Sequence, residues 1–563
     1  AGAGTYRITP ATPLGEGVFS AEFTFENFEG VARDTQTLII DKTPPRIEKM
    51  IPSGRILDPI SKILIQFDDG NALHEAELRN VVHYTLIAAG GDRLFGNGND
   101  FELNSAIREI QFDVTTSTVS LILFDPLPED AYQLAVASGA VVDLAGNVLP
   151  GNEVAGDRYV VSFENSRSIE IGHGGNKKLT IRDADGTTTT MRMSRGFASV
   201  RLGGQGLTLS ESRRGAVVTG EDVHFADIAV TNTSVGSLLV QSRRGRGSIE
   251  LRHMTVTGSL RKFRGPTLDL VGDLTVTGSV GRIHLRHARG GTVMIKDEEG
   301  SGRRLAMKLE NVQNLVFHTN TPMTSLTLNE WIDTNPDLVP DMITVPSLRR
   351  LIVRPRRGSG ANGAFHAGLR VLGSGALGLG NVHVAGTIGA VTWIVHGRVG
   401  RILAGSISSG FSASIAGPLS TITVKGHASG DIAATDIRRA MVVGDLTNAR
   451  WIAGATFGTD GVVRAAPDMF GAGKFKALTV RGQMRNSLVA AGVAPQGPVD
   501  FRSDFEAAVS FVDPESTVIR RISIRGGMDS DSRFIAGGLP RRVRGGTENI
   551  DPSTDMRFRT PPI

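Results

Sequence analysis

The chain of 563 residues has 61 basic and 57 acidic side chains, a net charge of +4, and 40% hydrophobic residues. This length favours several ordered domains, and no apolar run approaches the roughly 18 residues of a membrane-spanning helix. The absence of cysteine excludes disulfides, thiolate metal sites and cysteine nucleophiles, while 69 glycines indicate many turns.

Residues 1–45 have the pattern of β-strands. Phe19, Ala21 and Phe23 alternate with polar residues, as in a strand with one buried face, and the double proline of the DKTPP segment at 41–45 marks a joint between domains. An immunoglobulin-like sandwich needs about seven strands, whereas this segment has room for about three or four. We therefore expect a partial immunoglobulin-like domain at 1–45, whose missing strands either were cut away or come from another chain.

Residues 46–165 are long enough for a complete sandwich of the same kind. Ile63, Ile65 and Phe67 alternate in one predicted strand, and glycine-rich and asparagine-rich turns separate it from the next. The run at 138–147, SGAVVDLAGN, resembles the closing hairpin of bacterial immunoglobulin-like domains in S-layer and other giant secreted surface proteins. The DKTPP segment is similar to their interdomain linkers. The resemblance implies a secreted protein, located outside the cell or at the cell surface.

From residue 166 onward, short apolar triplets are punctuated by glycine. The segments 478–492 and 522–537 repeat one motif, and glycines recur at spacings near twenty, as at Gly258 and Gly278. A unit this short cannot bury its own apolar side, so we expect it to stack on its neighbours as coils of a parallel β-helix, with glycine at the corners. This region resembles the glycine-rich β-helical parts of very large bacterial surface proteins. We expect the stretches 296–348 and 455–475 to interrupt the coils as loops.

The predicted fold class is therefore all-β, with immunoglobulin-like sandwich modules followed by a parallel β-helix or β-solenoid. The expected domains divide the chain at four positions. They are a partial immunoglobulin-like domain at 1–45, a sandwich at 46–165, a cap or hairpin region at 166–200, and two solenoid parts at 201–345 and 346–563.

Calcium is the one metal for which the sequence offers a candidate site. Asp92, Asn97, Asn99 and Asp100 place four oxygen ligands within nine residues, among glycines, and flexible turns rich in oxygen suit Ca²⁺. Their spacing departs from the EF-hand loop. A hydrogen-bonded turn without metal is the alternative, and no other cofactor is expected.

The sequence offers little support for an enzyme. The Gly-His-Gly run at 172–174 resembles a polygalacturonase motif, but it precedes the coils, and the two carboxylates that glycoside hydrolysis requires are not recognisable. The pairs Asp68-Asp69 and Glu298-Glu299 have the character of solvated turn or loop residues. We therefore assign no catalytic residue.

Histidine and arginine patterns also have plain structural explanations. His284 and His287 should fall on opposite sides of a strand, which disfavours a zinc pair. Arginines are spread along the coils with few aromatic residues, which disfavours nucleic acid and suits pairing with carboxylates on the outer surface or contact with a neighbouring subunit.

Together these patterns predict a non-enzymatic structural subunit of a bacterial cell-surface layer or extracellular filament that assembles with copies of itself. One alternative is an adhesin that binds an acidic polysaccharide or a cell surface through arginine-lined coils. Another is a β-helical polysaccharide lyase or hydrolase, which would need carboxylates clustered across adjacent coils.

Overall fold

The structure, a computed structural model, describes residues 12, 14–27, 30–57, 59–69, 72–152, 157–166, 168–172, 176–298, 300–335, 341–373, 375–458, 468–495, 509–540, 543–546 and 548–560. The predicted all-β class is confirmed, because strands form nearly all of its regular structure. No helix in these ranges is long and apolar enough to cross a membrane. The chain packs as two units: Ala1–Ser168 with Gly203–Ser210, and Ile169–Leu202 with Glu211–Ile563.

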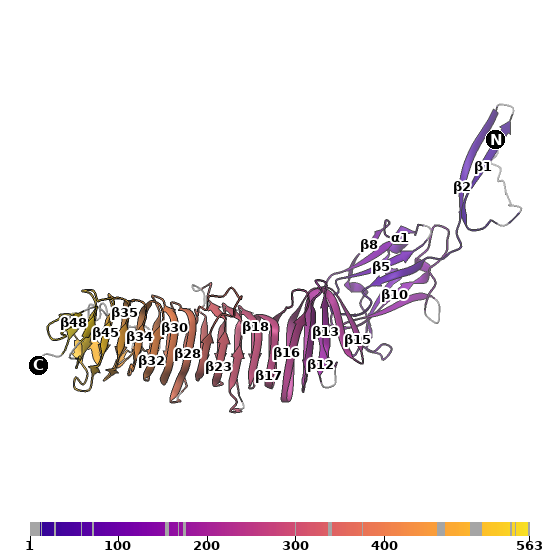
Figure 1. The fold of residues 1–563 in the computed structure, drawn as a ribbon. Helices are drawn as coiled ribbons and strands as arrows, with labels where there is room; N and C mark the ends of the chain where they lie inside the picture. Colours follow the sequence, from indigo (N-terminus) through magenta and orange to yellow (C-terminus); the bar gives the residue numbers. More distant parts are fainter. Residues whose placement is uncertain are drawn as a thin grey trace. The chain divides into compact units, whose positions relative to one another are not determined.

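The first unit begins with an isolated hairpin. In the described part of residues 1–45, strands β1 (Gly17–Asn27) and β2 (Gly30–Ile40) pair antiparallel as a two-stranded sheet (Figure 1). Phe19 lies opposite Leu38, so the alternating apolar residues share one side of the sheet, as predicted. The other side is polar: Arg33 donates to Glu22 over 3.0 Å. The hairpin is therefore amphipathic.

Two sheets enclose the core of the rest of this unit. One has the order β3–β5–β9–β8 and the other pairs β7–β6–β10–β11–β4. Ile63, Ile65 and Phe67 are buried on the inner side of β5, against Leu86 and Leu134 of the second sheet, which confirms the predicted alternation. The elements of this unit are β3 (Arg46–Ile51), β4 (Gly54–Ile56), β5 (Lys62–Asp68), α1 (Glu75–Leu78), η1 (Val81–His83), β6 (Tyr84–Ala88), β7 (Phe101–Glu102), η2 (Asn104–Ala106), β8 (Ile107–Asp113), β9 (Thr118–Leu123), β10 (Asp130–Ala137), η3 (Ser138–Ala140) and β11 (Arg158–Asn165).

The second unit, hereafter the coil region, begins with strands that join the edge of a long stack. Strand β13 pairs antiparallel with β14 and parallel with β16, and β14 also pairs antiparallel with β16. The strands here are β12 (Ser168–Gly172), β13 (Leu179–Asp183), β14 (Thr188–Met193), β15 (Phe197–Ser212), β16 (Gly215–Arg243) and β17 (Ile249–Val276), and the Gly203–Ser210 part of β15 packs with the first unit.

Beyond β17, most strands pair in parallel with the strand one coil later, so that they stack along the coil region (Figure 1). The pairings divide these strands into three stacks. Face 1 continues from β14, the part of β16 around Leu239 and the part of β17 around Arg264 through β18 (Arg282–Arg289), β20 (Leu305–Lys308), β23 (Met323–Leu328), β26 (Leu348–Val353), β28 (Leu377–Ile388), β30 (Arg398–Ile407), β32 (Leu419–Val424), β34 (Ala440–Val442), β39 (Leu478–Val480), β45 (Ile522–Ile524) and β47 (Val543–Gly545). Face 2 includes β21 (Asn311–Gln313), β24 (Glu330–Ile332) and β40 (Met484–Arg485). Face 3 includes β19 (Thr292–Ile295), β22 (Val316–Thr319), β25 (Met342–Val345), β27 (Gly368–Val371), β29 (Thr392–Val395), β31 (Ser412–Ile415), β33 (Ala428–Ala434), β35 (Leu446–Ala453), β41 (Leu488–Ala491), β46 (Arg533–Ala536) and β49 (Phe558–Arg559).

The repeated motif occupies equivalent positions on two successive coils. Leu478 pairs with Ile522, and the Gly526 amide donates to the Gly482 carbonyl over 3.0 Å. A Cβ atom on Gly526 would lie 2.5 Å from the Gly482 carbonyl carbon. Glycine is therefore required at this corner because the backbones of stacked coils approach each other closely.

The expectation that 296–348 interrupts the coils was wrong for most of that stretch. Strands β20 to β25 lie in it and stack in register with their neighbours. Asn314, with a φ of 52°, takes a left-handed corner conformation in place of glycine, so the glycine signal was missing there.

In the described residues of 455–475, Ala455, Phe457 and Phe470 pack against the outside of face 3, whereas Phe475 bridges Ile437 of the coils in parallel. Strand β36 (Ala455–Thr456) pairs with β37 (Met469–Phe470), and β42 (Val493–Pro495) pairs with β43 (Val509–Phe511). Phe457 joins Ile452 and Ile535, outward residues of face 3, in a second buried cluster. The remaining short strands are β38 (Lys474–Phe475), β44 (Val518–Ile519) and β48 (Glu548–Ile550).

Candidate functional site

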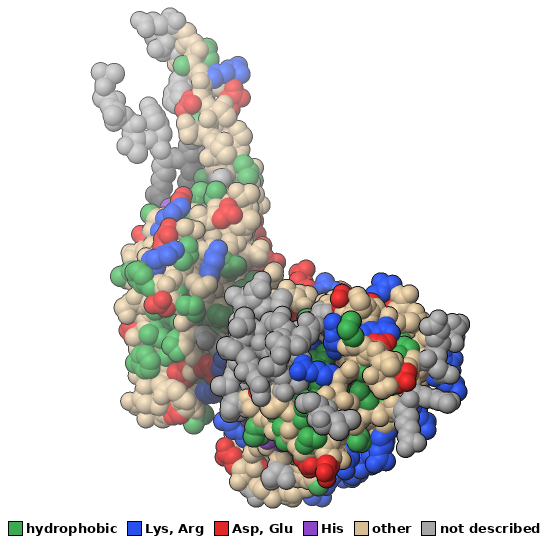
Figure 2. All heavy atoms as spheres, turned by 90° about the vertical axis from the view of Figure 1, so that its left-hand side faces the viewer, with side chains coloured by type: hydrophobic (Ala, Val, Ile, Leu, Met, Phe, Trp, Pro, Cys, Tyr) green, Lys and Arg blue, Asp and Glu red, His purple; other side chains and the backbone are tan. Residues whose placement is uncertain are grey.

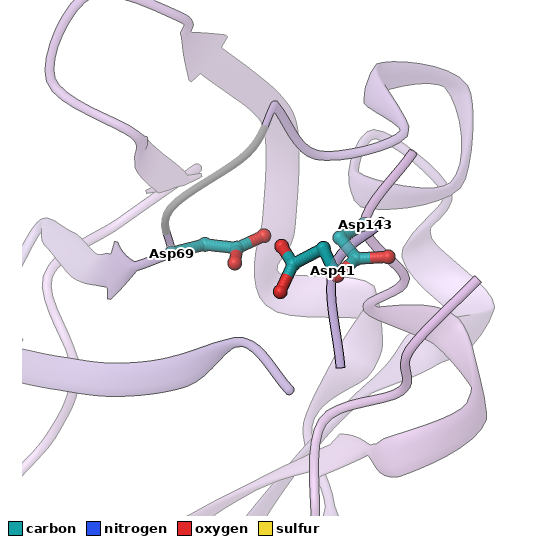
Figure 3. Close-up of side chains that lie close together, drawn as sticks. All are labelled: Asp41, Asp69 and Asp143. Atoms are coloured by element: carbon teal, nitrogen blue, oxygen red, sulfur yellow. The ribbon is translucent and has the colours of Figure 1, made fainter. Parts of the chain in front are cut away.

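Three aspartates converge in the first unit. The carboxylates of Asp41, Asp69 and Asp143 each offer an oxygen atom within 4.8 Å of the others (Figure 3). Asp41 follows β2, Asp69 follows β5, and Asp143 lies in the turn after η3. This acidic cluster therefore brings together the end of β2, the end of β5 and the turn after η3.

Asp143 is held by the turn that resembles a closing hairpin. It is fully buried, and its Oδ1 accepts hydrogen bonds from the amides of Ala145 and Asn147, each over 2.8 Å. Burial opposes ionisation of the Asp143 carboxyl, but hydrogen bonds from Asn147 and Ala145 outweigh burial and lower its pKa. Asp143 is therefore a buried carboxylate that stays charged near neutral pH.

Asn147 links this turn to the DKTPP segment. Its Nδ2 donates to Asp143 Oδ2 over 2.8 Å and to the carbonyl oxygen of Asp41 over 3.0 Å. Asp41 Oδ1 in turn accepts from the Thr43 amide over 2.9 Å. The two segments that resemble surface-protein motifs are therefore in direct contact.

Asp69 differs from its expected state. Asp68 is half-exposed and accepts from Arg46 Nε over 2.7 Å, whereas both carboxylate oxygens of Asp69 are shielded from solvent. The expectation of a solvated turn was therefore wrong for Asp69. No local pattern could have indicated this, because its neighbours Asp41 and Asp143 are distant in sequence.

The chemistry of this cluster is that of hard oxygen donors. Ca²⁺ takes about six to eight oxygen ligands, often carboxylates on turns. The three aspartates supply donors of this type, fewer than a complete site needs.

The predicted calcium loop is a separate turn in the same unit. Asp92 accepts from the Leu94 amide over 2.9 Å and from Asn97 Nδ2, and Asp100 accepts from the Gly96 amide over 2.6 Å. The Leu94 amide, with the Asn97 and Asn99 side chains, lowers the pKa of Asp92. These groups stabilise the turn by bonding to one another, and calcium at this loop stays a prediction.

The other residues singled out from the sequence lie apart. His284 aligns with Arg264 and Lys308 on face 1, whereas His287 aligns with Asn311 on face 2. Glu298 lies in a turn, and His173 and Glu299 fall outside the described residues.

The coil region has surface grooves that are poor in carboxylates. One of about 730 Å³ is lined by arginine, threonine, leucine and glutamine, and one of about 500 Å³ has Glu330 as its sole acidic residue among those described. Elsewhere in the coil region, Arg450 Nε donates to Asp431 Oδ1 over 2.8 Å between adjacent coils. This ion pair is an instance of the expected pairing of arginine with carboxylates. Neither groove offers the two carboxylates of a glycosidase.

No protein-family model matches this chain, and no curated protein is similar to it.

Proposed function

We propose that the chain is a non-enzymatic structural subunit of a bacterial cell-surface layer or extracellular filament. In this proposal it is secreted and it binds other copies of itself. The coil region is a β-solenoid that provides length, and the sandwich is an immunoglobulin-like module that positions the hairpin. The resemblance to giant surface proteins at 41–45 and 138–147 supports this assignment.

The exposed hairpin is the observation that carries the proposal. On the apolar side of the hairpin Leu38 is 49% exposed, and β1 and β2 pair with no third strand among the described residues. A two-stranded hairpin is marginally stable by itself, and open strand edges favour pairing with another chain. We infer that a neighbouring copy adds strands to the open edges of this hairpin through main-chain hydrogen bonds, and that side chains of that copy cover its apolar side.

The test is to remove residues 1–40 while keeping Asp41, and to measure mass by sedimentation velocity. The intact chain should form polymers, and the shortened chain should be monomeric with an unchanged circular-dichroism spectrum in the coil region. A more local variant combines Phe23→Thr with Leu38→Thr on the apolar side of the hairpin. The matched control, Val18→Thr with Val31→Thr, changes the polar side.

The proposal requires that only changes to the apolar side prevent assembly. Polymers of unchanged size after removal of residues 1–40 would overturn it. Equal loss of assembly in the control would contradict the proposal, because it would show that the contact does not depend on the apolar side of the hairpin.

A further inference from the structure

Face 1 of the coil region has a one-sided charge distribution. Strand register aligns one outward row along it that contains Arg192, Arg264, His284, Lys308, His383 and Arg544, and the other described positions of this row are threonine, serine, leucine, isoleucine or methionine. In a second outward row, Arg282 is followed on the next coils by Ala306 and Ser325. Further along the same row, Asn381 lies between Arg350 and Arg401. Neither row contains an aspartate or glutamate at these positions.

The basic rows begin at the groove of about 730 Å³ in the coil region. Arg182, Thr188 and Arg243 lie side by side on β13, β14 and β16, which puts the two arginines about 10 Å apart, or two strand spacings. Arg192 and Arg244 also line this groove, whose volume is about 730 Å³. Further along the same face, a groove of about 300 Å³ is lined by Arg282, His284 and Lys308 among others. The face is therefore hollowed at two places where cations gather.

These cations lack the carboxylate partners that arginines elsewhere have. Arg246, just beyond the first groove, lies 3.5 Å from Asp185 and 3.4 Å from Asp222. In the part of the chain that the structure describes, no ion pair involves Arg192, Arg264 or Lys308. Figure 2 also shows Lys and Arg side chains gathered unevenly, with many at the lower right of the coil region.

The two histidines on face 1 report the same excess of positive charge. Partial burial lowers the pKa of His284, and the charges of Lys308 and Arg264 lower it further. His383 behaves in the same way: burial acts first, then the charges of Lys425 and Arg354. Glu310, at the margin of the face, opposes this effect at His284 and lies 3.8 Å from Arg356.

We propose that face 1 binds an acidic polysaccharide that lies along the stacked coils. Arginine presents a planar fork that matches a carboxylate, and the threonine, serine and asparagine side chains between the cations can bond to sugar hydroxyls. Single-stranded nucleic acid would need aromatic residues on which bases stack, and neither described row has one. The inference does not depend on assembly through the hairpin.

The test uses polygalacturonate, which has a carboxylate on each sugar, and neutral dextran as the control polymer. Binding of the intact chain is measured by biolayer interferometry at several NaCl concentrations. The test variant combines Arg264→Ser, Arg282→Ser and Lys308→Ser, because Ser325 and Thr327 occupy the same rows on the next coil and show that small polar residues fit there. The matched variant combines Arg213→Ser, Arg252→Ser and Arg370→Ser, exposed residues outside face 1 with the same total charge change.

We expect the intact chain to bind polygalacturonate and not dextran, with affinity that falls as salt rises. The face 1 variant should bind at least about tenfold more weakly, because three counterion-releasing contacts are lost, and the matched variant within about twofold of the intact chain. Equal effects of the two variants, or tighter binding of oligo(dT) than of polygalacturonate, would overturn the proposal. So would a change in oligomeric state of the face 1 variant without polysaccharide, since the face would then bind another copy of the chain.

Discussion

The hairpin at 17–40 and the coil strands share one sequence pattern but differ in burial. Leu478 and Val480 alternate with polar residues and are fully buried, because the other two faces of the coil enclose them. Leu38 belongs to an equally regular strand, on the apolar side of the hairpin, and is 49% exposed. A period of two therefore identifies a strand with a side to bury, and only the neighbouring strands decide whether it is buried.

The largest contrast between the two regions should come from removing one large apolar side chain. Trp393 is buried in the coil, with ring centroids 6.1 Å from Phe365 and 5.2 Å from Phe411. Trp393→Ala should lower the free energy of unfolding by about 3–5 kcal/mol. In the monomer, Leu38→Ala should change it by less than about 0.5 kcal/mol. Urea unfolding followed by circular dichroism measures both, and equal losses would contradict the comparison.

A pH dependence should belong to the coil region, since the charged side of the hairpin is exposed. Asp341 is 2% exposed and accepts from Trp331 Nε1, and burial raises the pKa of its carboxyl from 3.8 to about 6. The folded state then holds this proton more tightly than the unfolded chain, so stability falls as pH rises from about 4 to 6, by at most about 3 kcal/mol. Asp341→Asn should remove that slope in unfolding measured between pH 4 and 7. An unchanged slope in the variant would show that other groups cause it.

The coils differ from the hairpin in having glycine corners, at which the backbones of neighbouring coils lie close together. A Cβ atom on Gly482 would lie 2.6 Å from the Gly444 carbonyl oxygen, whereas one on Gly375 would meet no atom within 4 Å. Gly482→Ala should lower the unfolding free energy by about 1–3 kcal/mol, as overpacking does. Gly375→Ala, the matched control, should leave the thermal midpoint nearly unchanged. If both variants melt together, stacking of these corners does not limit stability.

The smallest effect should arise where the hairpin meets the sandwich. Asn147→Ala removes the hydrogen bonds to Asp143 and to the Asp41 carbonyl, which should cost about 1–2 kcal/mol. Amide hydrogen exchange should become faster at 41–43 and 143–149, and remain unchanged in β39 and β45. Faster exchange throughout the chain would instead indicate global destabilisation.

Sequence patterns predicted the elements whose signal is local. The alternation in β5, the all-β class and the equivalence of 478–492 with 522–537 depend on neighbouring residues or on a repeated motif, and the structure confirms them. The stretch 296–348 was misjudged because corner residues such as Asn314 replace glycine there.

The acidic cluster and the basic rows could not be predicted from the sequence, because both depend on contacts between residues that are distant along the chain. Asp69 meets Asp41 and Asp143 only after the sandwich closes. The rows of face 1 depend on register between strands whose spacing varies: Phe263 pairs with Ile283, 20 residues on, whereas Leu351 pairs with Val382, 31 residues on. Such irregular spacing hides the alignment of charges from any fixed period.

Negative-stain electron microscopy of the intact chain over a range of concentrations tests the structural role most directly. The account predicts particles joined into strings or sheets with one repeat distance, which disperse into single particles when residues 1–40 are removed. Single particles of the intact chain at every concentration would contradict it.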